Sequence, residues 1–321
     1  MSEKASDLLI VNDLQKFFST PAGLLRAVDG VSFSIPRGKT MGVVGESGCG
    51  KSTLGRAILQ LHRPTGGEVL FNGQNVADMS KSQFKKIRPR MQMIFQDPYS
   101  SLNGRMTVQQ LIAEPLIINK VCRSRQEIDE RVAKMMDTVG LAQRLTLAYP
   151  HELDGGRRQR IGVARALILD PEFIVCDEPV SALDVSIQAQ ILNLLMDLQE
   201  ELGLTYLFIT HDLSMVTAIS DRIAVMYLGS IVELAPASAL YTDHRHPYTQ
   251  ALLSALPIPD PDVEAARRRV ILTGDIPSPI SLGQGCPFAG RCPQARPMCR
   301  EQRPELREVA PGHLAACHFA M

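Results

Sequence analysis

The chain has 321 residues, of which 45% are hydrophobic and 21% charged, and lysine plus arginine balance aspartate plus glutamate at 34 each. These proportions are typical of a soluble globular protein with one large core or two smaller ones, and the balanced charge excludes a generally basic surface that coats nucleic acid. The polar start predicts no signal peptide, and no apolar run reaches the about 18 residues that span a bilayer. We therefore expect a cytosolic protein that reaches a membrane only through partners.

Residues 8–75 alternate short apolar runs with turns, as at 8–11 and 68–71, which predicts antiparallel strands. Within this region residues 40–44 have the pattern of a short buried strand, and we expect the antiparallel strands to pack beside it. Residues 53–61 have the pattern of a helix. A glycine-rich loop connects this strand to this helix.

The loop fits the phosphate-loop pattern G-x-x-x-x-G-K-[ST] without a mismatch. Its glycines allow successive backbone N–H groups to curl around a polyphosphate, and the helix adds the positive end of its dipole. We expect Lys51 to reach the β- and γ-phosphates of ATP and the Ser52 hydroxyl to ligate Mg²⁺. A chance glycine turn is the alternative, which the order strand, loop, helix disfavours. The predicted ATP-binding residues of this loop are Gly45, Glu46, Ser47, Gly48, Cys49, Gly50, Lys51, Ser52 and Thr53.

Residues 107–148 carry a helical period of apolar residues, and residues 158–257 return to alternating strands and helices. This order predicts an α/β core sheet with a helical insertion. The apolar strand at 173–176 ends in two acids: Asp177 is placed to hold Mg²⁺, and Glu178 to polarise an attacking water. The alternative is that an acid here caps the turn that follows. The phosphate loop upstream favours the catalytic interpretation.

Further motifs follow in a fixed order, and their joint spacing resembles that of ATP-binding-cassette (ABC) ATPases over residues 8–256. The runs 99–103 and 246–249 narrow the resemblance to the ATP-binding subunits of dipeptide, oligopeptide and nickel importers. The other matching features are Phe18, Gln96, Leu153 to Arg157, Ser181 to Asp184, and His211.

The resemblance implies a phosphate-loop ATPase with a RecA-like mixed-sheet core, an antiparallel β subdomain and a helical subdomain at about 100–165. It also implies that an aromatic ring, assigned to Phe18, stacks on adenine, and that two cassettes close head to tail over two ATP molecules. Gly155 and Gly156 then contact the nucleotide held by the opposite chain. The implied catalytic residues are Glu178, His211 and Gln96, the magnesium ligands Ser52, Gln96 and Asp177, and the D-loop residues Ser181 and Asp184.

The signature motif departs from the family pattern L-S-G-G-Q, because Asp154 replaces the serine and Arg157 the glutamine. An ionised carboxylate cannot donate a hydrogen bond to a γ-phosphate, and it places one negative charge against another. Pairing of Arg157 with Asp154 or with the phosphate would offset this repulsion. We expect a weakened ATP site, and it is the site of the partner chain.

Prolines at 257, 259, 261, 277 and 279 predict a linker and then a small loop-rich appendix over residues 257–321. Four cysteines of the appendix are separated by five, six and seventeen residues, without the C-x-x-C pair of a zinc ribbon. Four thiolates suit a [4Fe–4S] cluster, which similar tails of the subfamily carry; zinc and four free thiols are the alternatives. We expect a structural staple. The predicted ligands are Cys286, Cys292, Cys299 and Cys317.

The sequence predicts an ATPase subunit that energises import of peptides or related small solutes from the cytoplasmic face of the cell membrane. The expected partners are a paralogous ATPase subunit, two transmembrane permease subunits and a substrate-binding protein, and no nucleic acid. The alternatives are a non-transport cassette ATPase that acts on nucleic acid or in translation, and an inactive structural partner. The single cassette and the balanced charge disfavour a non-transport cassette ATPase. The presence of Glu178 and His211 disfavours an inactive structural partner.

Overall fold

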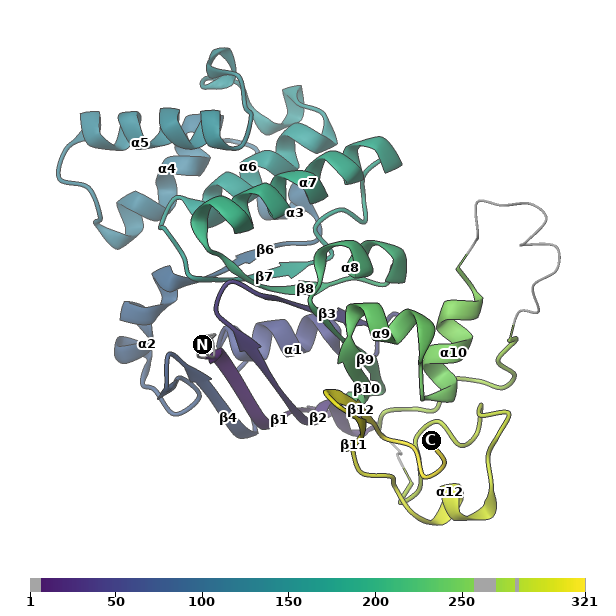
Figure 1. Ribbon diagram of the computed structural model, residues 1–321. Helices are drawn as coiled ribbons and strands as arrows, with labels where there is room; N and C mark the ends of the chain where they lie inside the picture. Colours follow the sequence, from purple (N-terminus) through teal and green to yellow (C-terminus); the bar gives the residue numbers. More distant parts are fainter. Residues whose placement is uncertain (1–6, 257–269, 281–282, 321) are drawn as a thin grey trace, which may run out of the picture. The chain divides into compact units, whose positions relative to one another are not determined.

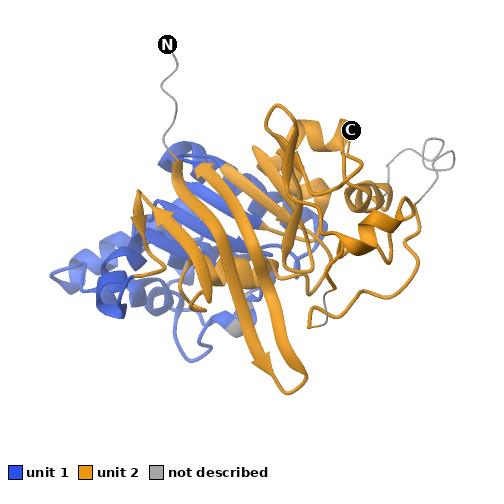
Figure 2. Ribbon diagram, turned by 90° about the horizontal axis from the view of Figure 1, so that it is seen from below, with its two compact units in different colours: residues 1–6, 36–39, 79–208 blue, residues 7–35, 40–78, 209–321 orange. Residues whose placement is uncertain are grey.

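The computed structural model describes residues 7–256, 270–280 and 283–320, which form two compact units (Figures 1 and 2). The first unit holds residues 36–39 and 79–208, and the second holds residues 7–35, 40–78 and the described part of 209–321. The polar N-terminal residues 1–6 and the predicted linker prolines Pro257, Pro259 and Pro261 lie outside the described residues. Each unit carries part of the predicted site.

The second unit contains the predicted antiparallel strands, in the order β2-β1-β4-β5. Leu9 and Val11 pair with Phe71 and Val69, and these four side chains are buried on the inner face of the sheet. The register shifts between Asn12 and Gln15, where a Cβ on Gly67 would lie 2.2 Å from a backbone oxygen. The strands are β1 (Asp7–Thr20), β2 (Gly23–Pro36), β4 (Gly66–Phe71) and β5 (Gln74–Asn75).

The strand before the phosphate loop, β3 (Thr40–Val44), does not neighbour these antiparallel strands, contrary to the prediction. It pairs in parallel with β9 (Arg222–Tyr227). The order of the hydrogen-bonded strands in this unit is β11-β12-β10-β9-β3. All five β3 residues are buried, as expected for a parallel strand covered on both faces. The N-terminal strands form a separate sheet, and they are less uniformly buried than β3. The predicted antiparallel pairing is correct, and the predicted neighbour is wrong.

The appendix is less loop-like than predicted, because its last two strands join this sheet (yellow in Figure 1). β12 (His313–Ala315) pairs with β10 (Ser230–Pro236), and β11 (Arg307–Ala310) pairs with β12. Pairing with an existing strand edge supplies the hydrogen bonds that these short segments lack alone. The helices of this unit are α1 (Lys51–Ile58), α8 (Leu213–Ile219), α9 (Ala237–Thr242), α10 (Pro247–Ser254) and α12 (Pro297–Glu301).

The first unit has three core strands in the order β8-β7-β6, and β6 and β7 run parallel. The predicted helical insertion is present here, as α4, α5 and α6. None of the described helices is long and apolar enough to cross a bilayer. The strands are β6 (Met91–Ile94), β7 (Phe173–Asp177) and β8 (Thr205–Ile209). The helices are α2 (Lys81–Ile87), α3 (Pro98–Ser101), α4 (Val108–Asn119), α5 (Arg125–Thr138), α6 (Gly155–Leu167) and α7 (Val185–Leu202), with 3₁₀ turns at Arg88–Arg90, Gln143–Leu145 and Pro150–Glu152.

Candidate active site

The phosphate loop follows β3 directly and requires glycine at two positions. Gly45 and Gly50 have φ angles of 154° and 107°. A Cβ at Gly45 would lie 2.1 Å from the backbone oxygen of Met226, and one at Gly50 would lie 2.0 Å from that of Ala27. The backbone itself therefore packs against its neighbours, and no other residue fits.

Helix α1 begins at Lys51, two residues before the predicted start, and ends at Ile58 rather than at residue 61. Its N-cap is Gly50, which has no side chain, so the N-terminal N–H groups point at the loop. The Lys51 ammonium donates to the carbonyl oxygens of Gly45 and Glu46, at 2.7 and 3.0 Å, and is almost fully buried. Ser52 and Thr53 follow in the first turn. A concentrated positive charge and helix N-terminus suit a polyphosphate.

Two loop residues make contacts that sequence reasoning missed. The Glu46 N–H donates to the Tyr248 hydroxyl at 2.9 Å, so this amide faces a protein group. The Glu46 carboxylate is ion-paired with Arg291 of the appendix. Burial raises the pKa of the Cys49 thiol, whose sulfur lies 3.9 Å from the Lys51 ammonium. No sequence pattern links Glu46 to residues more than 200 positions away.

The predicted adenine-stacking residue, Phe18, lies on β1 and is half-buried. Its ring meets His62 edge to face, with centroids 5.5 Å apart, and the Lys16 ammonium lies 4.7 Å from its centroid. One face of the Phe18 ring is therefore already in contact with the Lys16 ammonium. Stacking of this ring on adenine stays a prediction.

In the first unit, the structure brings Gln96 and Glu178 together. The two residues follow the parallel strands β6 and β7, whose carboxyl ends meet at one edge. The Gln96 amide nitrogen donates to the Glu178 carboxylate at 2.8 Å. Glu178 has a left-handed backbone, with φ of 46°, which costs a non-glycine residue on the order of 1–3 kcal/mol. Such strain is typical of a residue held in place for function.

The other predicted catalytic, magnesium-binding and D-loop residues of this region lie before or after Glu178 in the sequence. Asp177 ends β7 and is fully buried. Ser181 donates through its N–H and its hydroxyl to the Glu178 carbonyl, so the turn after β7 is closed by the backbone of Glu178. Asp184 is the N-cap position of α7. In the second unit, His211 lies between β8 and α8, next to the α8 N-cap Asp212.

The signature residues form the start of α6. Asp154 is its N-cap, and its carboxylate accepts from the Arg157 N–H at 2.8 Å. The Arg157 guanidinium lies 3.3 Å from the same carboxylate, so the predicted pairing of these two residues is present. A Cβ on Gly155 would lie 2.9 Å from the Leu183 side chain, and one on Gly156 would lie 2.8 Å from the Ile187 side chain of α7. These two side chains would have to shift to accept a larger residue at either position.

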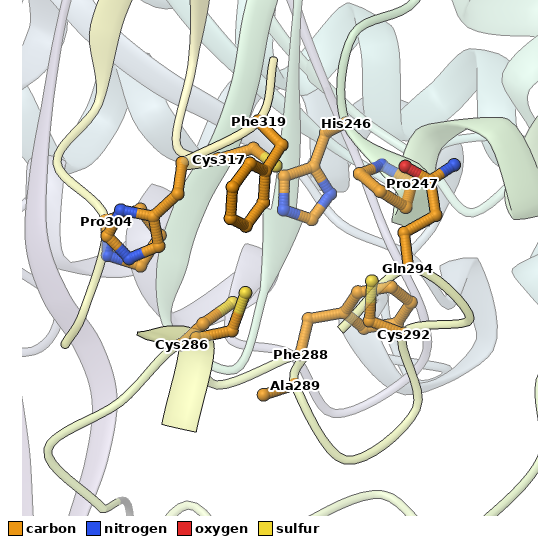
Figure 3. A pocket seen from close by; sticks show the side chains of 12 residues that line it. His246, Pro247, Cys286, Phe288, Ala289, Cys292, Gln294, Pro304, Cys317 and Phe319 are labelled. Atoms are coloured by element: carbon orange, nitrogen blue, oxygen red, sulfur yellow. The ribbon is translucent and has the colours of Figure 1, made fainter. Parts of the chain in front are cut away.

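The four appendix cysteines line one enclosed cavity of about 20 Å³ (Figure 3). Burial, with the neighbouring thiolates of Cys299, Cys292 and Cys317, raises the pKa of Cys286 to about 11. Burial likewise raises the pKa of Cys292. Within the described residues, no three histidine, cysteine, aspartate or glutamate side chains are placed to hold a single metal ion. The four cysteines therefore share one cavity, and their binding of a cluster or a metal stays a prediction.

Comparison with known proteins agrees with these features. Residues 28–181 match the ABC transporter family, and residues 232–299 match the oligopeptide/dipeptide transporter C-terminal region. The chain is 54% identical over 318 residues to the oligopeptide transport ATP-binding protein OppF of Bacillus subtilis, covering 99% of this chain and 97% of that protein. It is 50% identical over 320 residues to the oligopeptide transport ATP-binding protein AppF of the same organism, covering 97% of each.

Two solved structures are similar over the larger part of the chain. One is the dimeric ATP-binding cassette MJ0796 in a post-hydrolysis state with ADP and Pi, at a TM-score of 0.66 and 28% identity; it covers 71% of this chain and 98% of that one. The other is cbiO1 of Clostridium perfringens, described as part of an ABC transporter complex, at a TM-score of 0.66 and 27% identity. The match covers 74% of this chain and 91% of that one.

Proposed function

Because the chain belongs to the ABC transporter ATPase family, we propose that it energises the import of oligopeptides or dipeptides by binding and hydrolysing ATP. The observation that carries the peptide assignment is the match of residues 232–299 to the C-terminal region of oligopeptide and dipeptide transporters. The role of these relatives as oligopeptide transport ATP-binding proteins supports a transporter over a nucleic-acid or translation ATPase. Within this proposal, residues 8–256 form the ATPase domain, with a helical subdomain at about 100–165, and residues 257–321 its extension.

The roles of the site residues follow from their chemistry. Lys51 and the start of α1 bind the phosphates, while the hydroxyl of Ser52 and the carboxylate of Asp177 are hard oxygen ligands that suit Mg²⁺. Gln96 donates its amide nitrogen to Glu178, which leaves the amide oxygen as its cation ligand. Magnesium, when bound, neutralises phosphate charge.

Glu178 orients and polarises the attacking water, and Gln96 holds its carboxylate in place. His211 hydrogen-bonds the γ-phosphate, and Phe18 stacks on adenine. Gly155, Gly156, Ser181 and Asp184 face a partner cassette. We propose that this partner is a paralogous subunit, because two copies of the Asp154 and Arg157 signature would weaken both ATP sites. Within this proposal the chain lies on the cytoplasmic face of the membrane, bound to two transmembrane permease subunits, and a substrate-binding protein completes the complex.

The function is tested by reconstituting the complete complex in vesicles and measuring uptake of labelled peptides. We expect ATP-dependent uptake that the binding protein's own ligand stimulates. Replacing Lys51 with alanine removes the phosphate contact and should abolish both uptake and ATP hydrolysis. Uptake of nickel chelates and of no peptide by matched vesicles would contradict the peptide assignment and identify nickel chelates as the substrate class.

We propose that the four appendix cysteines hold a [4Fe–4S] cluster rather than zinc. A single zinc ion needs all its donors about 2.3 Å from one point, and no such group is present in the described ranges. A cluster spreads its four thiolates over four irons, so it suits a cage in which Cys286, Cys292, Cys299 and Cys317 share a cavity without converging. The cluster would act as a structural staple for the appendix.

Protein purified without oxygen should therefore be brown and contain iron and acid-labile sulfide in similar amounts. Replacing Cys286 with serine should remove the colour, since a hydroxyl is a poor ligand for iron–sulfur clusters. Cys122, which lies in the other unit, is the matched control, and its replacement by serine should keep the colour. Colourless wild-type protein with stoichiometric zinc would contradict the cluster.

A further inference from the structure

Arg291 connects the cysteine-rich appendix to the phosphate loop. It lies between the two cage cysteines Cys286 and Cys292 in the chain. Its two terminal nitrogens donate to the two carboxylate oxygens of Glu46, at 2.8 and 3.0 Å. Glu46 follows directly after the first glycine of the phosphate loop. The contact is a two-pronged ion pair, the geometry in which arginine binds carboxylates most specifically.

The surroundings of this pair fix it further. Arg291 is 9% exposed and Glu46 is 25% exposed. The Arg291 guanidinium also lies 3.5 Å from the Tyr227 hydroxyl, and Tyr248 accepts the Glu46 N–H. The ring of Phe288, another residue of the cysteine cavity, packs against both tyrosines with centroids 5.3 and 5.4 Å apart. Glu46 is therefore held at its carboxylate by Arg291 and at its backbone by Tyr248, and both of these residues contact the same aromatic cluster.

A second ion pair between the appendix and the cassette makes a useful contrast. Arg303 pairs with Asp29 of β2 at 2.8 Å, but Arg303 is 38% exposed and Asp29 is not part of the phosphate loop. Asp29 is only 11% exposed, but it keeps a second arginine, Arg26, at 3.9 Å when Arg303 is removed. Glu46 is paired with Arg291, which is itself nearly buried, and removing one partner of a buried pair leaves an uncompensated charge. Hydrogen bonding to Glu46 raises the pKa of Arg291 although burial opposes this, so the guanidinium stays charged.

We propose that Arg291 is a positioning residue of the nucleotide site, through which the cysteine cage supports ATP binding. Arg291 fixes the first turn of the phosphate loop and cancels the charge of Glu46. Without it, a carboxylate within the phosphate loop repels the polyphosphate. Loss of the cage ligands that flank Arg291 should displace this residue and weaken ATP binding in the same way. This inference rests on the proposed ATP-binding role of the loop.

The test compares two alanine variants of the full-length chain, Arg291→Ala and Arg303→Ala, by equilibrium binding of a fluorescent ATP analogue. Removing charge-assisted hydrogen bonds at Glu46 should raise the Kd about tenfold or more in the first variant. The second variant removes an appendix ion pair of the same kind and should stay within about twofold of wild type. Thermal unfolding and iron content, measured on the same samples, report whether the fold and the cage are intact.

A rescue separates positioning from folding. In the double variant Glu46→Gln with Arg291→Gln, two neutral amides replace the ion pair and no repelling charge remains, so most of the lost affinity should return. If Arg291→Ala does not fold, Arg291→Lys, which keeps the charge and loses the two-pronged geometry, is compared with Arg303→Lys instead. Equal Kd values for the Arg291 and Arg303 variants would overturn the proposal. Failure of the wild-type chain to bind the analogue would instead overturn the proposed function.

Discussion

Replacing Glu178 with glutamine should abolish most ATP hydrolysis in the assembled complex while ATP stays bound. Glutamine has the same shape, and its amide oxygen still accepts from Gln96, which now donates to the Glu178 carboxylate at 2.8 Å. The amide cannot polarise or deprotonate a water as a carboxylate does. Loss of a general base typically costs about a hundredfold or more in rate. Phosphate release and equilibrium nucleotide binding, measured on the same preparation, check both halves of the prediction.

Glu172 provides the matched control for this experiment. It precedes β7, whereas Glu178 follows β7, so the two acids lie at opposite ends of one strand. Glu172 is paired with Arg37 and Arg90. Its replacement by glutamine should lower the thermal stability and leave the rate per folded complex close to wild type. Near-normal hydrolysis by the Glu178→Gln complex would remove Glu178 from the proposed catalytic role.

Restoring the family signature, by Asp154→Ser with Arg157→Gln, should raise hydrolysis at the nucleotide held by the partner cassette. In the proposed head-to-tail dimer the signature contacts the nucleotide of the opposite chain, so this chain's own site should change little. Serine supplies a donor where Asp154 has none, and one good donor to a developing charge is worth roughly a hundredfold in rate. The change also keeps the helix, since serine is as good an N-cap as the aspartate that now accepts from the Arg157 N–H.

The two sites are distinguished by disabling one cassette at a time with Glu178→Gln or its counterpart in the partner. Asp154→Asn is the control, because asparagine keeps the cap and the size, removes the charge and adds an amide donor in a different position from the serine hydroxyl. Its rate should lie between those of the original and the restored signature. A complex of this chain with itself that hydrolyses ATP as fast as the full complex would contradict the asymmetry.

The parts of the site that the sequence predicts are local in the chain. The order strand, phosphate loop, helix was predictable because each step depends on neighbouring residues, and even there α1 begins at Lys51 because Gly50 serves as its N-cap. Asp177 and Glu178 were found because they end a buried apolar strand. The contact between Gln96 and Glu178 follows only once β6 and β7 are known to be parallel neighbours.

The parts that the sequence did not predict depend on distant partners. Strand β12 has three residues and is stabilised by pairing with β10, a partner that its own pattern does not reveal. The ion pair between Arg291 and Glu46 joins two positions without a shared motif. The pairing of β3 with β9, in a different sheet from the N-terminal strands, likewise results from the tertiary fold.

The distance between Glu46 and Arg291 along the chain also sets an order of events during synthesis. The two residues are 245 positions apart. At translation rates of 5–20 residues per second, the phosphate loop leaves the ribosome roughly 10 to 50 seconds before its arginine partner is made. Closing so long a loop of chain is slow compared with local folding. If Arg291 positions the phosphate loop as proposed, a nascent chain that stops before residue 291 carries an unfinished nucleotide pocket.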